Sequence, residues 1–278
     1  MTRKIGVVGA GTMGQGIANA FASAGNEVTV VDVKKEWAEN GVAKICASKD
    51  KLVARGKIDA EAAEAAKANL KAGVYEDLAD CDLIVEAVLE QMQVKKELFA
   101  KLDEIVKEGA IFGTNTSSLS VTEIANGIKH PVIGMHFFNP ADRMKLVEVI
   151  SGANTPAEVK DEIIAISKEI GKTPVEVNEG PGFVVNRILV PMINEATFIL
   201  QEGIASASDI DTAMQLGANH PMGPLALGDL IGLDIVLAIM DVLYNETGDS
   251  KYRASTLLRK MVRAGKLGRK TGEGFFKY

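Results

Sequence analysis

Residues 4–32 read KIGVVGAGTMGQGIANAFASAGNEVTVVD and place a glycine-rich turn between two apolar runs. The runs Lys4–Val8 and Glu27–Val31 have the length and the β-branched content of buried strands, and the segment between them has a helical pattern. Three glycines follow the first run directly in the spacing GxGxxG, and they are Gly9, Gly11 and Gly14. The order of strand, glycine turn, helix and second strand predicts the first unit of a sheet that binds a dinucleotide.

Each glycine of this turn has a physical task. Gly9 permits the tight turn, Gly11 lets the backbone approach a pyrophosphate, and Gly14 lets the helix pack closely on the strand. The helix N-terminus adds N–H groups and the positive end of its dipole. A glycine triplet also occurs in purely structural turns, but here all parts of the motif stand in order. The predicted cofactor contacts of the turn are Gly9, Ala10, Gly11, Thr12, Met13 and Gly14.

An acidic residue, Asp32, ends the second predicted strand. Its carboxylate can accept hydrogen bonds from both hydroxyls of an adenosine ribose, and it would repel a 2′-phosphate. We therefore predict NAD rather than NADP as the cofactor. Lys34 and Lys35 follow closely and moderate this preference.

Strand-like and helix-like stretches alternate through the first 180 residues, which predicts an α/β fold with a doubly wound, mostly parallel sheet. We expect an NAD-binding domain at residues 1–182. Residues 36–72 are too long for a simple crossover and predict a helical hairpin split near Gly56. The other expected strands are Asp82–Val88, Ala110–Gly113, Val132–Phe137, Lys145–Ile150 and Pro174–Val177.

After Gly180-Pro181-Gly182 the pattern becomes helical, which predicts an all-helical domain at residues 183–278. Pro191 is expected to bend the first helix. Ser208 and Gly217 are expected to cap the second helix, and Pro224 to begin the third. The apolar excess of this domain predicts a homodimer or a higher homo-oligomer that assembles through it.

Composition excludes several classes of function. The hydrophobic and charged fractions, 47% and 24%, are those of a globular protein, and the net charge of −6 argues against nucleic acid or an anionic membrane as partners. Cys46 and Cys81 have no neighbours at ligand spacing, so no metal is expected and both are expected to be reduced thiols. No signal-peptide core or membrane-length apolar run is present, so we expect a soluble, cytoplasmic protein.

One titratable residue, His136, lies inside a predicted strand, in the sequence GMHFFNP at residues 134–140. It is either a core histidine with one satisfied hydrogen bond or a general acid/base. The next predicted strand carries Glu148 on the same face as two apolar residues, where an unpaired charge would be costly. A His136–Glu148 pair would satisfy both groups. The alternative is that Glu148 is a solvated edge residue.

Ordered motifs along the whole chain resemble the L-3-hydroxyacyl-CoA dehydrogenase family, most closely its short bacterial members that act on 3-hydroxybutyryl-CoA. These motifs are GAGTMGQGIA, VEAVLE, NTSSLS, GMHFFNP, MKLVEVI, PGFVVNR, DIDTAMQLGANHPMGP and GRKTGEGFF. The resemblance implies that His136 is the catalytic base, that Glu148 orients it, and that Ser117 and Asn186 bind the substrate oxygens. It also implies that further residues line the NAD pocket beside Asp32, namely Glu90, Lys95, Ser117, Asn139 and Lys270.

Without the resemblance, four of these pocket residues have simpler interpretations. Glu90 and Lys95 read as solvated charges at a helix start, Asn139 as a turn residue and Lys270 as a tail charge. The resemblance further implies that the 36–72 hairpin takes part in acyl-CoA binding. Lys51 and Arg55 lie at i, i+4 and could bind the CoA phosphates, although a merely solvated helix face explains them equally well.

The implied reaction is the reversible, NAD-dependent oxidation of (S)-3-hydroxybutyryl-CoA to acetoacetyl-CoA. One alternative is a dehydrogenase of free β-hydroxy acids, which would place a lysine where this chain has Asn186-Arg187. Another is a non-catalytic relative that keeps the fold as a structural or NAD-binding protein. The sequence leaves the chain-length preference, the physiological direction and the oligomer size open.

Overall fold

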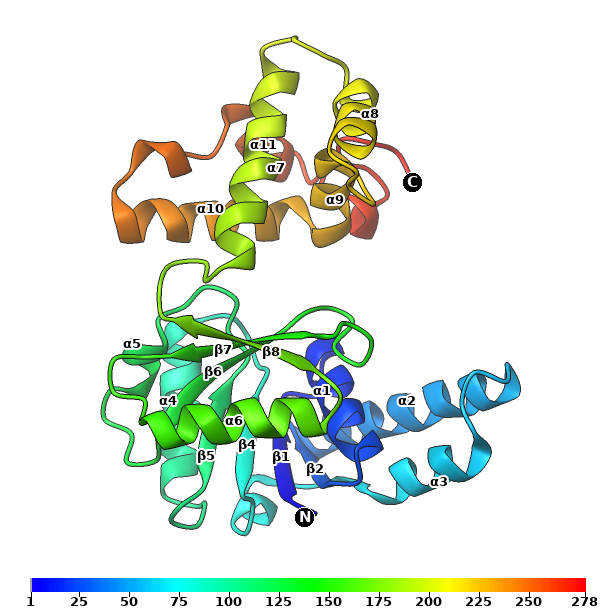
Figure 1. Cartoon of the computed structure of the whole chain (residues 1–278), viewed down its shortest axis with the longest axis vertical. Coiled ribbons are helices and arrows are strands. Elements are labelled where there is room, and N and C mark those ends of the chain that lie inside the picture. Colours follow the sequence, from blue (N-terminus) through cyan, green and yellow to red (C-terminus); the bar gives the residue numbers. More distant parts are fainter. Residues whose placement is uncertain (1) are drawn as a thin grey trace. The chain divides into compact units, whose positions relative to one another are not determined.

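The computed structural model describes residues 2–278 and divides into two compact units, the first ending at Glu179 and the second spanning Gly180–Tyr278. Figure 1 shows a sheet with flanking helices in the first unit and helices alone in the second.

The described part of the first unit forms an eight-stranded sheet in the order β3-β2-β1-β4-β5-β6-β7-β8. Neighbouring strands are parallel except for β6 and β7, which are antiparallel. The predicted α/β fold with a mostly parallel sheet is therefore confirmed. The strands are β1 (Lys4–Val8), β2 (Glu27–Val31), β3 (Leu70–Ala72), β4 (Leu83–Glu86), β5 (Ile111–Thr114), β6 (Val132–Phe137), β7 (Leu146–Ser151) and β8 (Thr173–Asn178).

Helices cover both faces of this sheet. On one face, α1 (Thr12–Ser23), α2 (Lys35–Ala54) and α6 (Ala157–Glu169) pack with the alternate strand residues, such as Val7, Val85 and Met135, into one apolar core. On the other face lie α4 (Met92–Asp103) and α5 (Val121–Ala125), and Phe99 of α4 stacks on Phe112 of β5 at 5.3 Å.

Because side chains alternate along a strand, the second face also receives the polar residues of the central strands. Glu86 ends β4, Thr114 ends β5, His136 lies near the end of β6, and Glu148 lies opposite His136 in β7. Four neighbouring strands thus direct polar side chains to one face of the sheet.

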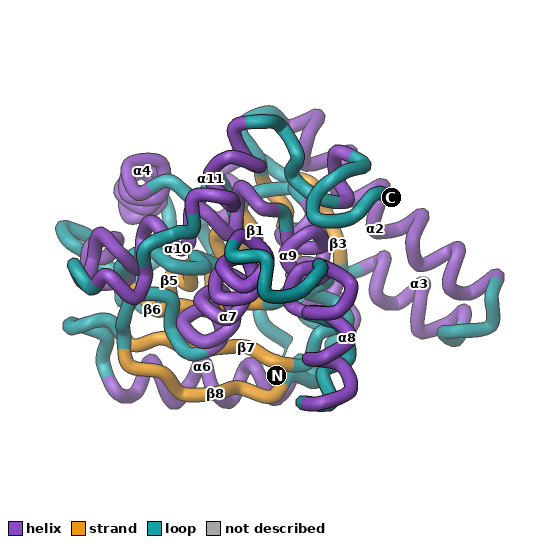
Figure 2. The backbone as a smooth tube through the Cα atoms, turned by 90° about the horizontal axis from the view of Figure 1, so that it is seen from above, coloured by secondary structure: helices purple, strands orange, loops and turns teal. Residues whose placement is uncertain are grey.

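The helices α2 and α3 (Ala60–Ala68) form a hairpin that extends away from the sheet beyond β3 in Figures 1 and 2. Gly56, in the left-handed region at φ +63°, lies in the turn between them. The expectation of helix through residue 72 was wrong at its end, because Leu70–Ala72 pairs with β2 as the edge strand β3.

The second unit is built from helices around a core that includes Val236, Met240 and Leu243. Pro191 lies inside α7, and Pro224 begins α9 as predicted. The prediction that Ser208 is the N-cap of α8 was wrong. The N-cap is Ser206, whose hydroxyl accepts the N–H of Asp209 at 3.2 Å. The helices are α7 (Val185–Gln201), α8 (Ala207–Gly217), α9 (Pro224–Ile231), α10 (Leu233–Thr247) and α11 (Thr256–Arg263). Across residues 2–278, none of the helices has the length and apolar character needed to cross a membrane.

Candidate active site

The glycine turn after β1 has the geometry that a pyrophosphate requires. Gly9 has φ +105°, and a Cβ added there would lie 2.4 Å from the carbonyl oxygen of Ala87. A Cβ on Gly14 would lie 1.7 Å from the oxygen of Gly9, so helix and turn are in close contact. A Cβ on Gly11 would meet no atom within 4 Å, and α1 begins at the next residue without a side-chain cap. The backbone N–H groups of the helix start are thus open to an anionic ligand, which fits NAD.

Asp32 follows β2 and faces the same turn. Its Oδ2 accepts the N–H of Ala10 at 2.7 Å, and its Oδ1 accepts the N–H of Val33 at 2.7 Å. Lys34 and Lys35, which follow Asp32 in the sequence, contact other side chains. The ammonium of Lys34 lies 5.3 Å from the ring of Trp37, and that of Lys35 lies 3.9 Å from Glu39.

The antiparallel pairing of β6 with β7 places His136 directly opposite Glu148. Nδ1 of His136 lies 2.7 Å from Oε2 of Glu148. The two residues are 6% and 1% exposed, so the alternative of Glu148 as a solvated edge residue is excluded. The ring of Phe138 lies 4.4 Å from the imidazole.

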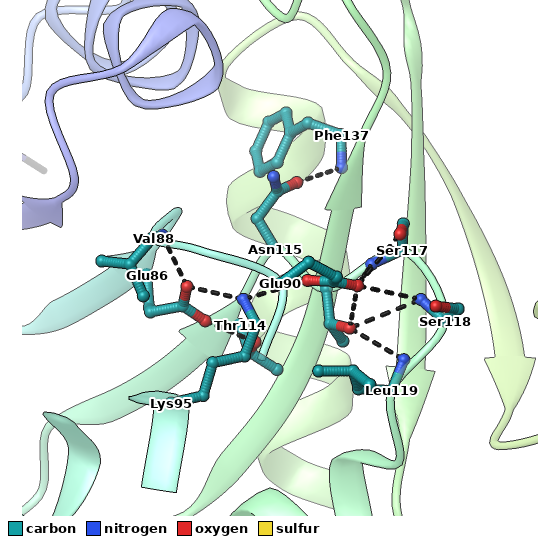
Figure 3. Close-up of polar contacts among 11 residues, drawn as sticks. Glu86, Val88, Glu90, Lys95, Thr114, Asn115, Ser117, Ser118, Leu119 and Phe137 are labelled. Carbon is teal, nitrogen blue, oxygen red and sulfur yellow. Dashed lines mark hydrogen bonds and ion pairs between the residues drawn. The ribbon is translucent and has the colours of Figure 1, made fainter. Parts of the chain in front are cut away.

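Ser117 lies in the turn after β5, and this turn is bound to the carboxylate of Glu90 (Figure 3). Oε1 of Glu90 accepts the backbone N–H of Ser117 at 2.6 Å and its hydroxyl at 2.9 Å. The same oxygen accepts the hydroxyl of Thr116 at 2.7 Å and the N–H of Ser118 at 3.2 Å. We call residues 116–118 the serine turn. One carboxylate oxygen of Glu90 thus contacts each of its three residues, and the hydroxyl of Thr116 also accepts the N–H of Leu119 at 2.9 Å.

Lys95 is fully buried, so the interpretation of this residue as a solvated helix-start charge was wrong. Its ammonium lies 2.7 Å from Oε1 of Glu86 and 3.2 Å from Oε2 of Glu90. The side chain of Glu90 is 36% exposed, and its partial desolvation would raise its pKa. The charge of Lys95 and the hydrogen bonds from the serine turn outweigh this effect and lower that pKa. Glu90 therefore stays charged at neutral pH.

Asn115 joins the serine turn to the strand that carries His136. Its side-chain oxygen accepts the N–H of Phe137 at 2.8 Å (Figure 3). Neither Asn115 nor Glu86 was predicted as a site residue. A sequence signal existed for Glu86, because a carboxylate that ends the apolar run LIVE of a central parallel strand needs a buried partner.

The remaining predicted residues lie elsewhere. Asn139 is exposed in the turn after β6. Lys51 and Arg55 are exposed on α2 and at its C-terminal end. Two belong to the second unit: Asn186 lies in the first turn of α7, and Lys270 forms an ion pair with Asp234 at 2.5 Å. In the first unit, the predicted site residues thus form three groups by their contacts. These groups are the glycine turn with Asp32, the His136–Glu148 pair, and Ser117 with Glu90 and Lys95.

Family models of known proteins match both units. The family model for the NAD-binding domain of 3-hydroxyacyl-CoA dehydrogenases matches residues 4–180, and the model for their C-terminal domain matches residues 182–278. A 3-hydroxybutyryl-CoA dehydrogenase of Clostridioides difficile is 56% identical over 99% of both chains. A probable enzyme of the same name from Deinococcus radiodurans is 50% identical over 99% of this chain and 100% of its own.

A solved structure gives the same result in three dimensions. The crystal structure of the (S)-3-hydroxybutyryl-CoA dehydrogenase from Ralstonia eutropha has a TM-score of 0.96 and 47% identity, and the match covers 100% of this chain and 99% of that one. Because the family model of the NAD-binding domain matches the first unit and that of the C-terminal domain matches the second, the protein is an NAD-dependent oxidoreductase. The chain belongs to the 3-hydroxyacyl-CoA dehydrogenase family.

Proposed function

We propose that the protein catalyses the reversible, NAD-dependent oxidation of (S)-3-hydroxybutyryl-CoA to acetoacetyl-CoA, with His136 and Glu148 as its acid/base pair. The names of the relatives from Clostridioides difficile and Ralstonia eutropha support the substrate class. The observation that carries the chemistry is the buried contact of 2.7 Å between His136 and Glu148. His136 lies near the carboxyl end of β6, and α/β sheets bind their ligands at the carboxyl ends of the parallel strands.

We assign one role to each nitrogen of the imidazole. Nδ1 faces Glu148, and a charged carboxylate can only accept a hydrogen bond, so Nδ1 carries the proton of the neutral ring. Nε2 then has the lone pair that takes the hydroxyl proton of the substrate. Glu148 fixes this tautomer and stabilises the imidazolium that forms, and in the reduction His136 returns the proton as a general acid.

The other proposed roles concern binding. NAD, when bound, accepts the hydride from C3 of the alcohol, and the glycine turn with Asp32 holds its pyrophosphate and ribose. Ser117 binds the substrate oxygen, and Asn186 is retained as a second ligand on the sequence resemblance. Lys51 and Arg55 bind the CoA phosphates. Exposed apolar side chains of the helical unit, such as Ile188 at 68% and Leu216 at 82%, support the predicted homo-oligomer.

An NADH-consumption assay with acetoacetyl-CoA, set against free acetoacetate, tests the proposal. We expect turnover with the thioester and little with the free acid. Faster turnover of the free acid would instead support a dehydrogenase of free β-hydroxy acids. NADH binding without turnover of either compound would support a non-catalytic relative.

A further inference from the structure

Glu86 is a buried carboxylate that the proposed reaction does not use. Its side chain is fully enclosed at the end of β4. Oε1 accepts the N–H of Val88 and the ammonium of Lys95, each at 2.7 Å, and Oε2 accepts the hydroxyl of Thr114 at 2.7 Å. Since the side chain reaches no solvent, any effect of Glu86 on a ligand must pass through its neighbours.

The ammonium of Lys95 is shared unequally between two carboxylates. It lies 2.7 Å from Glu86 and 3.2 Å from Oε2 of Glu90, so its stronger contact is with Glu86. The other oxygen of Glu90, Oε1, accepts four hydrogen bonds from the serine turn. The carboxylate of Glu90 thus contacts both Lys95 and the serine turn, and the ammonium of Lys95 also contacts Glu86 (Figure 3).

We propose that Glu86 is a positioning residue for Ser117. The ion pair between Glu86 and Lys95 keeps the ammonium from binding Glu90 more closely. The carboxylate of Glu90 then remains available to accept the hydrogen bonds of the serine turn, which position the hydroxyl of Ser117. Loss of the charge on Glu86 would leave Lys95 a single anionic partner, and the ammonium would then compete with the serine turn for Glu90. The inference rests on the proposed function in one respect, the role of Ser117 as a substrate ligand.

A double-mutant cycle tests whether Glu86 acts through Ser117. Glu86→Gln keeps the size of the side chain, and we expect it to lower kcat for acetoacetyl-CoA reduction on the order of tenfold. In a Ser117→Ala background the same substitution should change kcat less than about twofold, because the hydroxyl it positions is absent. Losses that multiply in the double variant would overturn the proposal, since a merely structural defect acts independently of that hydroxyl.

Hydrogen exchange provides a readout that does not need activity. Glu86→Gln should accelerate amide exchange at Ser117 and Ser118 on the order of tenfold, and unchanged exchange there would overturn the proposal. Asp103→Asn is the matched control, because this buried carboxylate binds the N–H groups of Lys129 and His130 in another turn. It should lower the melting temperature and leave both kcat and exchange in the serine turn unchanged.

Two further outcomes keep the inference separate from the proposed function. If Glu86→Gln does not accumulate as folded protein, Glu86→Asp keeps the charge but draws it back by one methylene. That variant should show the same local increase in exchange at a smaller size, and no increase would overturn the proposal. If wild-type protein does not reduce acetoacetyl-CoA, the proposed function fails, while the exchange measurement still decides the role of Glu86.

Discussion

The imidazole of His136 and the carboxylate of Glu148 lie 2.7 Å apart because the antiparallel ladder of β6 and β7 pairs these two residues directly. Only residues 138–145 separate the strands, and a parallel crossover needs a dozen or more. The short connection therefore forces a hairpin, and the hairpin register sets the pair. Both side chains are buried, and each is the polar partner that the other needs in the interior.

His136→Gln should abolish most of the activity without unfolding the protein. If His136 is the acid/base, kcat should fall on the order of 10²–10⁴-fold, while NADH affinity and the far-UV spectrum persist. A variant with near-normal turnover but lower stability would show that His136 is a core histidine.

Glu148→Gln should reduce kcat less than His136→Gln does. The amide keeps the shape of the side chain and still accepts a hydrogen bond from Nδ1, but it lacks the charge that stabilises the imidazolium. The double variant should be about as active as His136→Gln alone, because Glu148 acts through the imidazole. Independent, multiplying losses in steady-state kcat would contradict this assignment.

Much of the sheet could be predicted because its strands are short apolar runs between turn residues. Lys4–Val8, Glu27–Val31 and Val132–Phe137 were predicted to the residue. β3 was missed because the three residues LKA continue an alanine- and lysine-rich helical pattern, and only pairing with Val28–Val30 makes them a strand. Such tertiary pairing leaves no local signal.

The candidate site shows a similar limit. Glycines and Asp32 could be found because their order along the chain is itself the motif. The burial of Lys95 could not be predicted in this way. Its two anionic partners, Glu86 and Glu90, come from a strand end and from the loop before the helix, at no fixed helical spacing. A lysine near a helix start is usually solvated. Only the fold shows that this one is enclosed.

Asp32 should make NADH the preferred cofactor over NADPH. A carboxylate close to a 2′-phosphate costs about 1–3 kcal/mol, which corresponds to roughly five- to 150-fold in kcat/KM. Asp32→Ala should narrow the ratio of the two kcat/KM values, mainly by improving NADPH. Comparable values for both cofactors in the wild type would refute the prediction and indicate a phosphate clamp at Lys34 and Lys35.

Asp103 should stabilise the protein in a pH-dependent way. Burial would raise its pKa, but hydrogen bonds from the side chain of His130 and from the N–H groups of Lys129 and His130 lower it below the ordinary value. A carboxylate with a lowered folded-state pKa stabilises the fold above the unfolded pKa, about 4, and loses this effect as pH falls through the folded pKa. The difference in melting temperature between the wild type and Asp103→Asn should therefore be largest at pH 6–7 and shrink below about pH 4. A deficit that stays constant down to pH 3 would contradict it.

Lys51 and Arg55 should contribute to binding of the CoA moiety and not to the chemical step. Both are exposed and one helical turn apart, so their cations can face the same phosphates. The double alanine variant should raise KM for acetoacetyl-CoA on the order of tenfold and leave kcat within about twofold, because exposed charge pairs act mainly on association and are screened by salt. Lys168→Ala removes one exposed cation from α6, controls for the loss of a surface cation away from α2, and should leave KM unchanged. An equal rise of KM in the control, or none in the double variant, would mean that the α2 residues form only a solvated helix face.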